Sequence, residues 1–217
     1  MSIKQFISRT LIALEVVSSK LLHMNVEDVK QFISHTLIAL TMVMVSRLLI
    51  SGFDSKDFVI GNYLWLPIGA VILSYLLFGF KVFPGVLLGY LIAEMLIEGS
   101  VAGMYLDADI SQRELLSRTM SSLGPIFAIV IMRAFSLSNF FDDNKINIGH
   151  IFFLVLLSAV ISTLLKTFFV YNEAQKFLDN PVEHIGSYLV GDMIGGIVFI
   201  YIGIKVFALF FGRNKSI

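Results

Sequence analysis

Long apolar stretches separated by short polar segments dominate this chain. Six of them have the length that a bilayer-spanning helix needs, about 17–25 residues. They run roughly over residues 35–51, 58–80, 82–98, 119–137, 151–171 and 185–211. Because charged residues are rare inside them, the pattern predicts an all-α integral membrane protein, a polytopic bundle of about six transmembrane helices.

The N-terminal region contains a duplicated motif. A single substitution, Arg9 against His35, separates residues 4–14 from residues 30–40. The second copy leads into the first apolar stretch, whereas charges follow the first copy and make it amphipathic. We therefore expect an amphipathic helix on the membrane surface ahead of the first span. A seventh span in this segment is the alternative.

This pattern divides the chain into an amphipathic N-terminal segment (1–34), a membrane domain (35–211) and a short tail (212–217). Lysine and arginine are more frequent in the segments on the side of the two termini than in the opposite loops. The positive-inside rule then places both termini, and therefore the tail, in the cytoplasm.

The composition narrows the possible functions. Hydrophobic residues make up 57% of the chain and charged residues 15%, against about 25% charged in soluble domains. Sixteen basic residues balance sixteen acidic ones, so no basic surplus indicates a nucleic-acid partner. The chain has no cysteine, and its four histidines show no ligand spacing. We therefore expect no metal site, no cofactor and no enzymatic activity.

Four ionisable side chains lie inside the apolar stretches, namely Arg47, Glu94, Lys166 and Asp192. Charge at that depth is costly, usually faces a protein interior or water, and indicates a functional site. Counting about 1.5 Å per helical residue from the span ends places all four roughly 6–10 Å below a membrane face. Since consecutive spans alternate in direction, the four residues share one layer.

Other polar and aromatic residues belong to the same layer. Asn62 and Trp65 lie early in the second stretch, and Arg118 lies at the rim of the layer. A proline inside a span frees a backbone carbonyl, which is tolerated beside polar partners, so we expect Pro67 to interrupt its helix there. The predicted ligand-binding residues are Asp192, Glu94, Trp65, Arg47, Lys166, Asn62 and Arg118.

Two simpler interpretations of the charges remain open at this point. Acids and bases on different helices pair in many membrane proteins and then only hold the bundle together. Arg47 and Lys166 are also close enough to a membrane face to extend their charged ends toward the water. Asp192 has the least reach and is the strongest candidate for a paired or hydrogen-bonded group.

Small residues and loop composition complete the pattern. Glycines four residues apart let helix backbones approach closely, and such pairs occur at Gly85–Gly89, Gly99–Gly103 and Gly191–Gly195. The loop over residues 99–118 contains a stretch that suits a short surface helix, capped by Asp109 or Ser111.

Two motifs resemble those of a known family. Leu64-Trp-Leu-Pro-Ile-Gly69, followed by a basic turn and Phe83-Pro-Gly-Val-Leu-Leu-Gly89, resembles the opening of the bacterial membrane-associated sensor domain of the first type. That domain shows Trp-Pro-Pro-x-Gly and then Trp/Phe-Pro-Gly-x-x-x-Gly. Tyr188-Leu-Val-Gly-Asp-Met-Ile-Gly195 resembles its last motif, aromatic-x-x-Gly-Asp-x-x-Gly. This chain has Leu66 where the family has its first proline.

The resemblance covers roughly residues 58–211 and implies a sensor module of the bacterial inner membrane. In that family the module usually precedes a histidine kinase, a diguanylate cyclase or a cyclic-dinucleotide phosphodiesterase. No output domain is present up to Ile217, so we expect a stand-alone module that signals through a separate partner. The expected location is the bacterial inner membrane, with both termini in the cytoplasm.

Three functions are therefore compatible with the sequence. The first is a sensory or ligand-binding module whose small-molecule ligand is unknown and whose partner is a kinase or cyclase. The second is a small transporter, or the substrate-capturing subunit of one, since a compact bundle with a polar layer suits that role equally. The third is a structural or assembly protein in which the charges only join helices.

Overall fold

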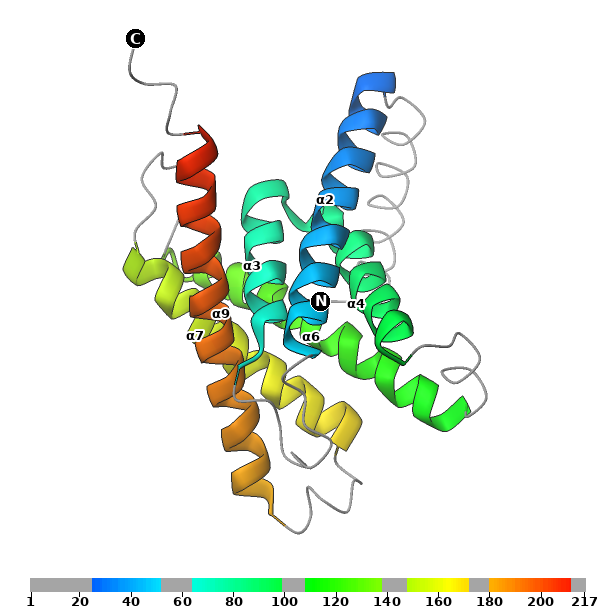
Figure 1. Cartoon of the computed structure of the whole chain (residues 1–217). Helices are drawn as coiled ribbons and strands as arrows, with labels where there is room; N and C mark the ends of the chain where they lie inside the picture. The colour runs from blue at the N-terminus through cyan, green and yellow to red at the C-terminus, as the bar shows by residue number, and fades with distance from the viewer. Residues whose placement is uncertain (1–24, 52–63, 99–107, 138–147, 172–179, 212–217) are drawn as a thin grey trace, which may run out of the picture. The chain divides into compact units, whose positions relative to one another are not determined.

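The computed structural model describes residues 25–51, 64–98, 108–137, 148–171 and 180–211 (Figure 1). Every regular element in these ranges is helical. In chain order they are α2 (Val26–Ser51), α3 (Leu66–Phe78), the 3-10 turn η1 (Phe80–Val82), α4 (Phe83–Glu98), α6 (Ala108–Ala134), α7 (Ile148–Lys166), the π-helical turn η2 (Thr167–Tyr171) and α9 (Pro181–Phe211).

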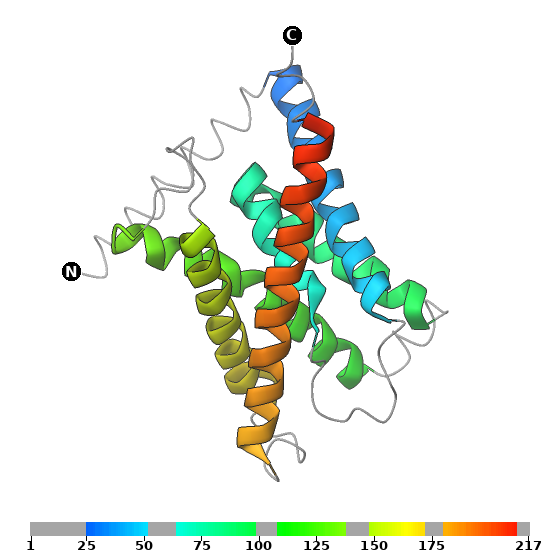
Figure 2. The ribbon, with the colours of Figure 1, turned by 60° about the vertical axis from the view of Figure 1, so that its left-hand side comes forward.

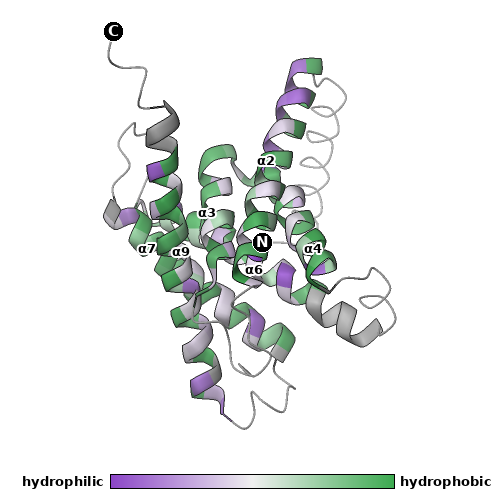
Figure 3. Ribbon diagram, viewed as in Figure 1, coloured by the Kyte–Doolittle hydropathy of each residue, from purple (hydrophilic) through white to green (hydrophobic). Residues whose placement is uncertain are grey.

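Within these ranges, five helical segments are long and apolar enough to cross a membrane. They are Val26–Ser51, Phe80–Ile97, Leu115–Ala134, Gly149–Val170 and Pro181–Val206. Figure 3 shows how strongly apolar positions dominate these helices. Many of their leucine, isoleucine, valine and phenylalanine side chains are exposed, as expected of surfaces in contact with lipid. The chain is therefore an all-α, multi-pass membrane protein, as its apolar pattern predicted.

The chain divides into two compact units, residues 1–35 and residues 36–217. In the first unit, the structure describes the opening turns of α2. Glu27 and Asp28 lie in the first turn, where acidic residues favour a helix N-terminus. Glu27 also forms an exposed ion pair with Lys30, with 3.2 Å between Oε1 and Nζ.

The start of α2 differs from the sequence-based boundary. The helix begins at Val26 and not at residue 35, because the second copy of the duplicated motif is itself helical. The first copy, within residues 1–24, lies outside the described residues. The prediction of an amphipathic surface helix there stays a prediction.

The predicted second span is shorter than expected. Of residues 58–80, only Leu66–Phe78 form an α-helix, and residues 58–63 lie outside the described residues. Thirteen helical residues rise about 20 Å, less than the roughly 30 Å of a hydrocarbon core. The helix ends at Gly79, whose φ of 75° lies in the left-handed region. The chain then turns through η1 directly into α4.

The interruption predicted at Pro67 is wrong. Proline occupies the first turn of α3, where the backbone N–H has no partner within the helix in any case. Pro67 therefore begins the helix and does not break it. The residue before this turn, Trp65, has φ −103° and ψ 81° and forms the N-cap position without a side-chain cap.

The helix predicted within residues 99–118 is present from Ala108, but it continues into the following apolar stretch. A single helix, α6, runs from Ala108 to Ala134, so Asp109 and Ser111 lie within its bounds and not ahead of its first residue. The sequence from Ala108 to Arg118 contains no glycine or proline that would end a helix. The polar turns therefore continue straight into the apolar ones.

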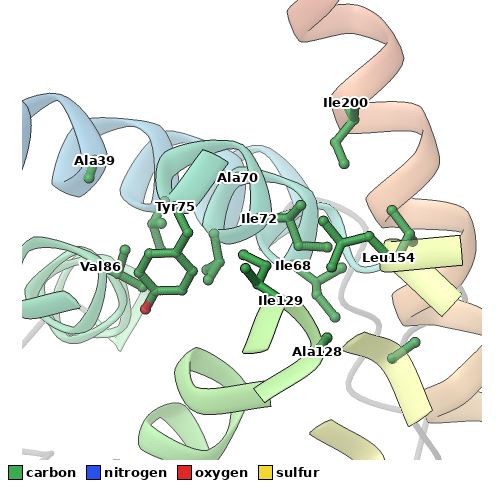
Figure 4. Close-up of a cluster of buried hydrophobic side chains, with 14 of the residues drawn as sticks. Ala39, Ile68, Ala70, Ile72, Tyr75, Val86, Ala128, Ile129, Leu154 and Ile200 are labelled. Carbon is green, nitrogen blue, oxygen red and sulfur yellow. The ribbon is translucent and has the colours of Figure 1, made fainter. Parts of the chain in front are cut away.

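The core of the second unit lies around α3, which contacts α4, α6, α7 and α9. Figure 4 shows Tyr75, Ile68 and Ile72 of α3 among Ile129 of α6 and Leu154 of α7, all buried. The Tyr75 hydroxyl donates a hydrogen bond to the backbone oxygen of Ser122, at 3.1 Å. Helices α6 and α7 pack together, and α7 lies beside α9 (Figure 2).

Glycines bring the backbones of α2 and α4 into contact. A Cβ atom added at Gly85 would overlap the backbone oxygen of Thr36, and one added at Gly89 would lie 2.6 Å from that of Leu40. No side chain fits between the helices at these two positions. This close approach is the packing that the Gly85–Gly89 spacing predicted, whereas Gly99–Gly103 lies outside the described residues.

Glycines of α9 have the same role toward the start of α3 and toward α7. A Cβ added at Gly195 would overlap the backbone of Trp65, and one added at Gly196 would lie 2.7 Å from a methyl group of Val155. Gly186, earlier in the same helix, has no atom within 4 Å of the corresponding position. Space at Gly195 is therefore a requirement of the α3–α9 contact.

We expect the Gly195→Ala substitution to lower the melting temperature of the detergent-purified protein. Its methyl group would overlap the backbone of Trp65, and overpacking of this kind costs about 1–3 kcal/mol. Gly186→Ala is the matched control in the same helix, and we expect it to leave the melting temperature unchanged or slightly raised. Equal destabilisation by both substitutions would contradict the close contact.

Candidate functional site

The predicted charges lie on five different helices. Arg47 is on α2, Glu94 on α4, Arg118 on α6, Lys166 at the end of α7 and Asp192 on α9. The residues predicted to lie within the membrane are strongly buried, with exposed fractions of 6% for Arg47, 5% for Glu94, 4% for Lys166 and 2% for Asp192. Because they are buried, these charged groups must be neutralised by one another.

Glu94 is the acceptor for two arginines. Arg47 donates to both of its carboxylate oxygens, with Nε to Oε1 at 2.8 Å and Nη2 to Oε2 at 3.3 Å. Arg118 approaches the same Oε1 through its Nη2, at 2.7 Å. Two-point contacts between guanidinium and carboxylate groups are among the strongest protein hydrogen bonds. One carboxylate therefore joins α2, α4 and α6.

Trp65 lies next to both arginines. The Cζ atoms of Arg47 and Arg118 lie 5.0 Å and 5.3 Å from the centre of its ring. Both distances are within the roughly 6 Å over which a cation and an aromatic face attract each other. Arg118 also lies 5.8 Å from the ring centre of Tyr90. The two guanidinium groups are thus held between a carboxylate and aromatic rings.

Lys166 and Asp192 form the second charged contact. The Lys166 Nζ lies 3.7 Å from the Asp192 Oδ2, which is an ion pair but too long for a hydrogen bond. The same Nζ lies 4.8 Å from the ring centre of Tyr188. Lys166 ends α7 and is followed at once by the π-helical turn η2. Such turns occur often at functional sites.

Trp65 also connects the two charged contacts through its backbone. Its N–H donates to the Gly191 backbone oxygen at 2.9 Å, one residue before Asp192. Gly195, one turn later, leaves the space that the Trp65 backbone occupies. We call the assembly of Arg47, Trp65, Tyr90, Glu94, Arg118, Lys166, Tyr188 and Asp192 the charged cluster.

Each glycine and acid of the stretch Tyr188–Gly195 has a structural role in the charged cluster. Gly191 accepts the Trp65 N–H, Asp192 pairs with Lys166, and Gly195 admits the backbone of Trp65. The stretch around Trp65 meets the same helix further on, where a Cβ added at Gly69 would lie 2.6 Å from the Cβ of Phe199. The two motifs, far apart in the sequence, therefore lie against each other.

One interpretation of the sequence changes at this point. Arg47 and Lys166 do not extend toward the membrane face, because both are buried in ion pairs with acids on neighbouring helices. Of the other predicted ligand residues, Trp65 and Arg118 join the charged cluster, whereas Asn62 lies outside the described residues.

Sequence reasoning missed the tyrosines of the charged cluster. Tyr90 precedes Glu94 by four residues and Tyr188 precedes Asp192 by four residues. Residues four apart share a helix face, so each tyrosine lies on the face of a predicted acid. That spacing was a usable signal, but aromatic residues are too common in an apolar chain to stand out without a known acid beside them.

The buried polar atoms of the charged cluster include Trp65 Nε1, the Tyr90 hydroxyl and Asp192 Oδ2, which have no hydrogen-bond partner among the described residues. The first two lie near enough to interact, yet not in hydrogen-bonding geometry. Most buried polar groups in proteins are hydrogen-bonded. Here each of the three atoms has a polar neighbour, Trp65 for Tyr90 and Lys166 for Asp192, but no hydrogen bond in good geometry.

The charged cluster combines carboxylate, guanidinium and ammonium groups with aromatic rings. No group of three or more His, Asp or Glu side chains suited to a metal ion occurs in the part of the chain that the structure describes. The arginines are permanently charged, planar donors suited to oxyanions. Comparison of the chain with known protein families, with curated proteins and with solved structures finds no match.

We expect the Glu94→Gln substitution to destabilise the purified protein strongly. Removing one partner of a buried ion pair typically costs about 3–5 kcal/mol, because the remaining charges stay buried. Glu27→Gln removes an acid whose side chain is 78% exposed in its ion pair with Lys30, and we expect no measurable change. Thermal unfolding of both variants in the same detergent checks the difference.

Thermal unfolding also tests whether Glu94 pairs with both Arg47 and Arg118. If it served Arg47 alone, the double variant R47E/E94R would restore the pair and recover stability. Arg118 would then face a new cation at position 94, so we expect no recovery. Full recovery in the double variant would contradict the shared carboxylate.

Proposed function

We propose that this chain is a sensory, ligand-binding module of the bacterial inner membrane, and that the charged cluster is its ligand site. The observation that carries the proposal is that Glu94, Arg47, Arg118 and Trp65 contact one another from four separate helical segments. The backbone of Trp65 joins this group to α9. A ligand that altered these contacts would change how the helices pack.

A purely structural role for the charges fits the contacts less well. A pair that only holds helices needs its polar groups satisfied, because an unpaired buried polar group costs about 1–3 kcal/mol. Here Trp65 Nε1, the Tyr90 hydroxyl and Asp192 Oδ2 lack hydrogen-bond partners among the described residues. A ligand with matching polar groups would remove that cost, which favours a binding role.

Because the site lies between helices, ligand binding there could be transmitted as a change in helix packing. A ligand that binds one helix arrangement more tightly than another shifts the protein toward that arrangement. The Lys166–Asp192 contact, at 3.7 Å without a hydrogen bond, joins α7 to α9 more loosely than Glu94 joins its helices. We propose that α9 responds to ligand and that a separate kinase, cyclase or phosphodiesterase reads the change.

The test uses Trp65, which is the only tryptophan of the chain and lies in the site. A panel of anionic, neutral and cationic small molecules is added to the purified protein while Trp65 fluorescence and melting temperature are recorded. We expect at least one compound to shift the emission and raise the melting temperature. In Asp192→Asn and Glu94→Gln, we expect its apparent affinity to fall about tenfold or more, equivalent to about 1.4 kcal/mol.

Glu27→Gln is the control, because its exposed ion pair lies in the other compact unit. We expect this variant to bind like the unmodified protein. The proposal fails if no compound of any charge class shifts both signals. It also fails if folded Asp192→Asn and Glu94→Gln bind every active compound with unchanged affinity.

A further inference from the structure

We infer that Asp192 is a proton-operated switch between α7 and α9, with two positions for the ammonium group of Lys166. While Asp192 is charged, Lys166 pairs with it across the two helices. Once Asp192 has taken up a proton, Lys166 turns to the hydroxyls of Ser162 and Thr163 on its own helix. The inference goes beyond the proposed function, because it needs no small-molecule ligand and is tested without one.

Asp192 is the acid of the charged cluster whose protonation displaces the fewest contacts. Glu94 is held by two arginines, at distances of 2.7, 2.8 and 3.3 Å. The Oδ2 atom of Asp192 has an ion pair at 3.7 Å and no hydrogen-bond partner among the described residues. Hydrogen bonds to a carboxylate favour its charged form, so Glu94 keeps its charge more firmly than Asp192. A proton also needs no preformed cavity, since buried carboxyl groups in proteins do titrate.

Lys166 has a second position within reach on its own helix. Side chains in an α-helix lean toward the N-terminus, over the residues three and four positions earlier. For Lys166 these are Thr163 and Ser162, which are 4% and 1% exposed. Their hydroxyl oxygens have no hydrogen-bond partner among the residues that the structure describes. Both oxygens can accept a hydrogen bond from an ammonium group, so a released Lys166 meets two buried acceptors.

Loss of the ion pair changes the contact between two helices. Helices α7 and α9 pack against each other, and Lys166 and Asp192 join them by charge. Beside a neutral Asp192, Lys166 would keep a buried charge without a counter-ion, which is costly. It is therefore driven from α9 toward the hydroxyls of α7. The π-helical turn η2 begins at the next residue, and such turns are concentrated at functional sites.

The step itself is the uptake of one proton. A proton from water binds a carboxylate oxygen of Asp192, no other covalent bond forms or breaks, and the charge of the cluster rises by one. The ion pair is present while Asp192 is charged and is lost as the pH falls through the titration of this carboxyl group. Acidification therefore loosens the contact between α7 and α9, and a rise in pH restores it.

The groups around Asp192 leave few other sources of a pH response. Helices α3 and α7 make the main contacts with α9. Helix α3 meets it through Trp65, which does not titrate, and α7 through Lys166. The charged cluster also contains the phenols of Tyr90 on α4 and Tyr188 on α9. Phenols ordinarily titrate near pH 10, well above the range of carboxyl groups.

The test records Trp65 emission while the full-length protein, in a neutral detergent, is titrated from about pH 9 to about pH 4, a range wide enough for buried carboxyl groups. Trp65 is the only tryptophan of the chain, and its N–H donates to the backbone oxygen of Gly191, next to Asp192. Infrared difference spectra over the same range detect the C=O group of a newly protonated carboxyl. We expect a reversible emission step that coincides with such a band.

Asp192→Asn removes the proton acceptor and keeps a neutral side chain of similar size. We expect this variant to lack the step and its carboxyl band, and to show at every pH the emission of the acidified unmodified protein. Glu183→Gln is the matched control, because Glu183 is an exposed acid in the first turn of the same helix. This control should keep the step at an unchanged pH.

A second pair of variants tests where Lys166 goes. Hydroxyls that receive Lys166 stabilise the protonated state of Asp192, so their removal makes proton uptake harder. We expect S162A/T163V to move the midpoint of the step to lower pH by roughly one unit, as for the loss of a hydrogen bond to a charged group. Ser158→Ala is the control. It removes another buried hydroxyl without a hydrogen-bond partner among the described residues, about 12 Å from Lys166 along the helix, and should leave the midpoint unchanged.

The inference is overturned if the unmodified protein shows no reversible step, or if the step and its carboxyl band persist in Asp192→Asn. It is also overturned if S162A/T163V titrates like Ser158→Ala. Should Asp192→Asn fail to fold, the comparison of these two hydroxyl variants still decides. None of these results affects the proposed function, which is judged by the compound panel described above.

Discussion

The bundle depends on one constraint, the accommodation of charge inside an apolar structure. A carboxylate in such a place must be neutralised by near neighbours, because no water replaces them. Glu94 meets this requirement with Arg47 on one side and Arg118 on the other. Arg47, Glu94 and Arg118 must point toward one another, and this fixes the rotation of α2, α4 and α6 about their axes. The apolar contacts between these helices depend on that rotation.

The second constraint is steric and acts on the same place. Trp65 reaches the arginines only because Gly195 leaves room for its backbone and Gly191 accepts its N–H. A larger residue at position 195 would move the start of α3 away from α9 and remove the aromatic ring from both guanidinium groups. The glycines of α9 and the charges of α2, α4 and α6 therefore depend on one another. Their residue types alone give no sign of this dependence.

Much of this was predictable from the sequence, for identifiable reasons. Hydropathy locates long apolar helices because lipid demands them, and alternating direction places Arg47, Glu94, Lys166 and Asp192 in one layer. Partner choice was not predictable, since it depends on helix rotation. Only the three-dimensional structure shows that Arg118 shares Glu94 with Arg47 and that Tyr90 lies beside Arg118. The start of α3 at Leu66 was misjudged, because a hydropathy pattern does not register where the backbone leaves helical dihedral angles.

Stability alone does not account for the five charges. Replacing a buried ion pair by apolar side chains of similar size is often neutral or even stabilising, so an apolar centre would hold this bundle equally well. Ionic contacts differ from apolar ones in that a polar ligand can exchange with them. The ligand-binding role proposed above would give these charges a purpose that packing alone does not require.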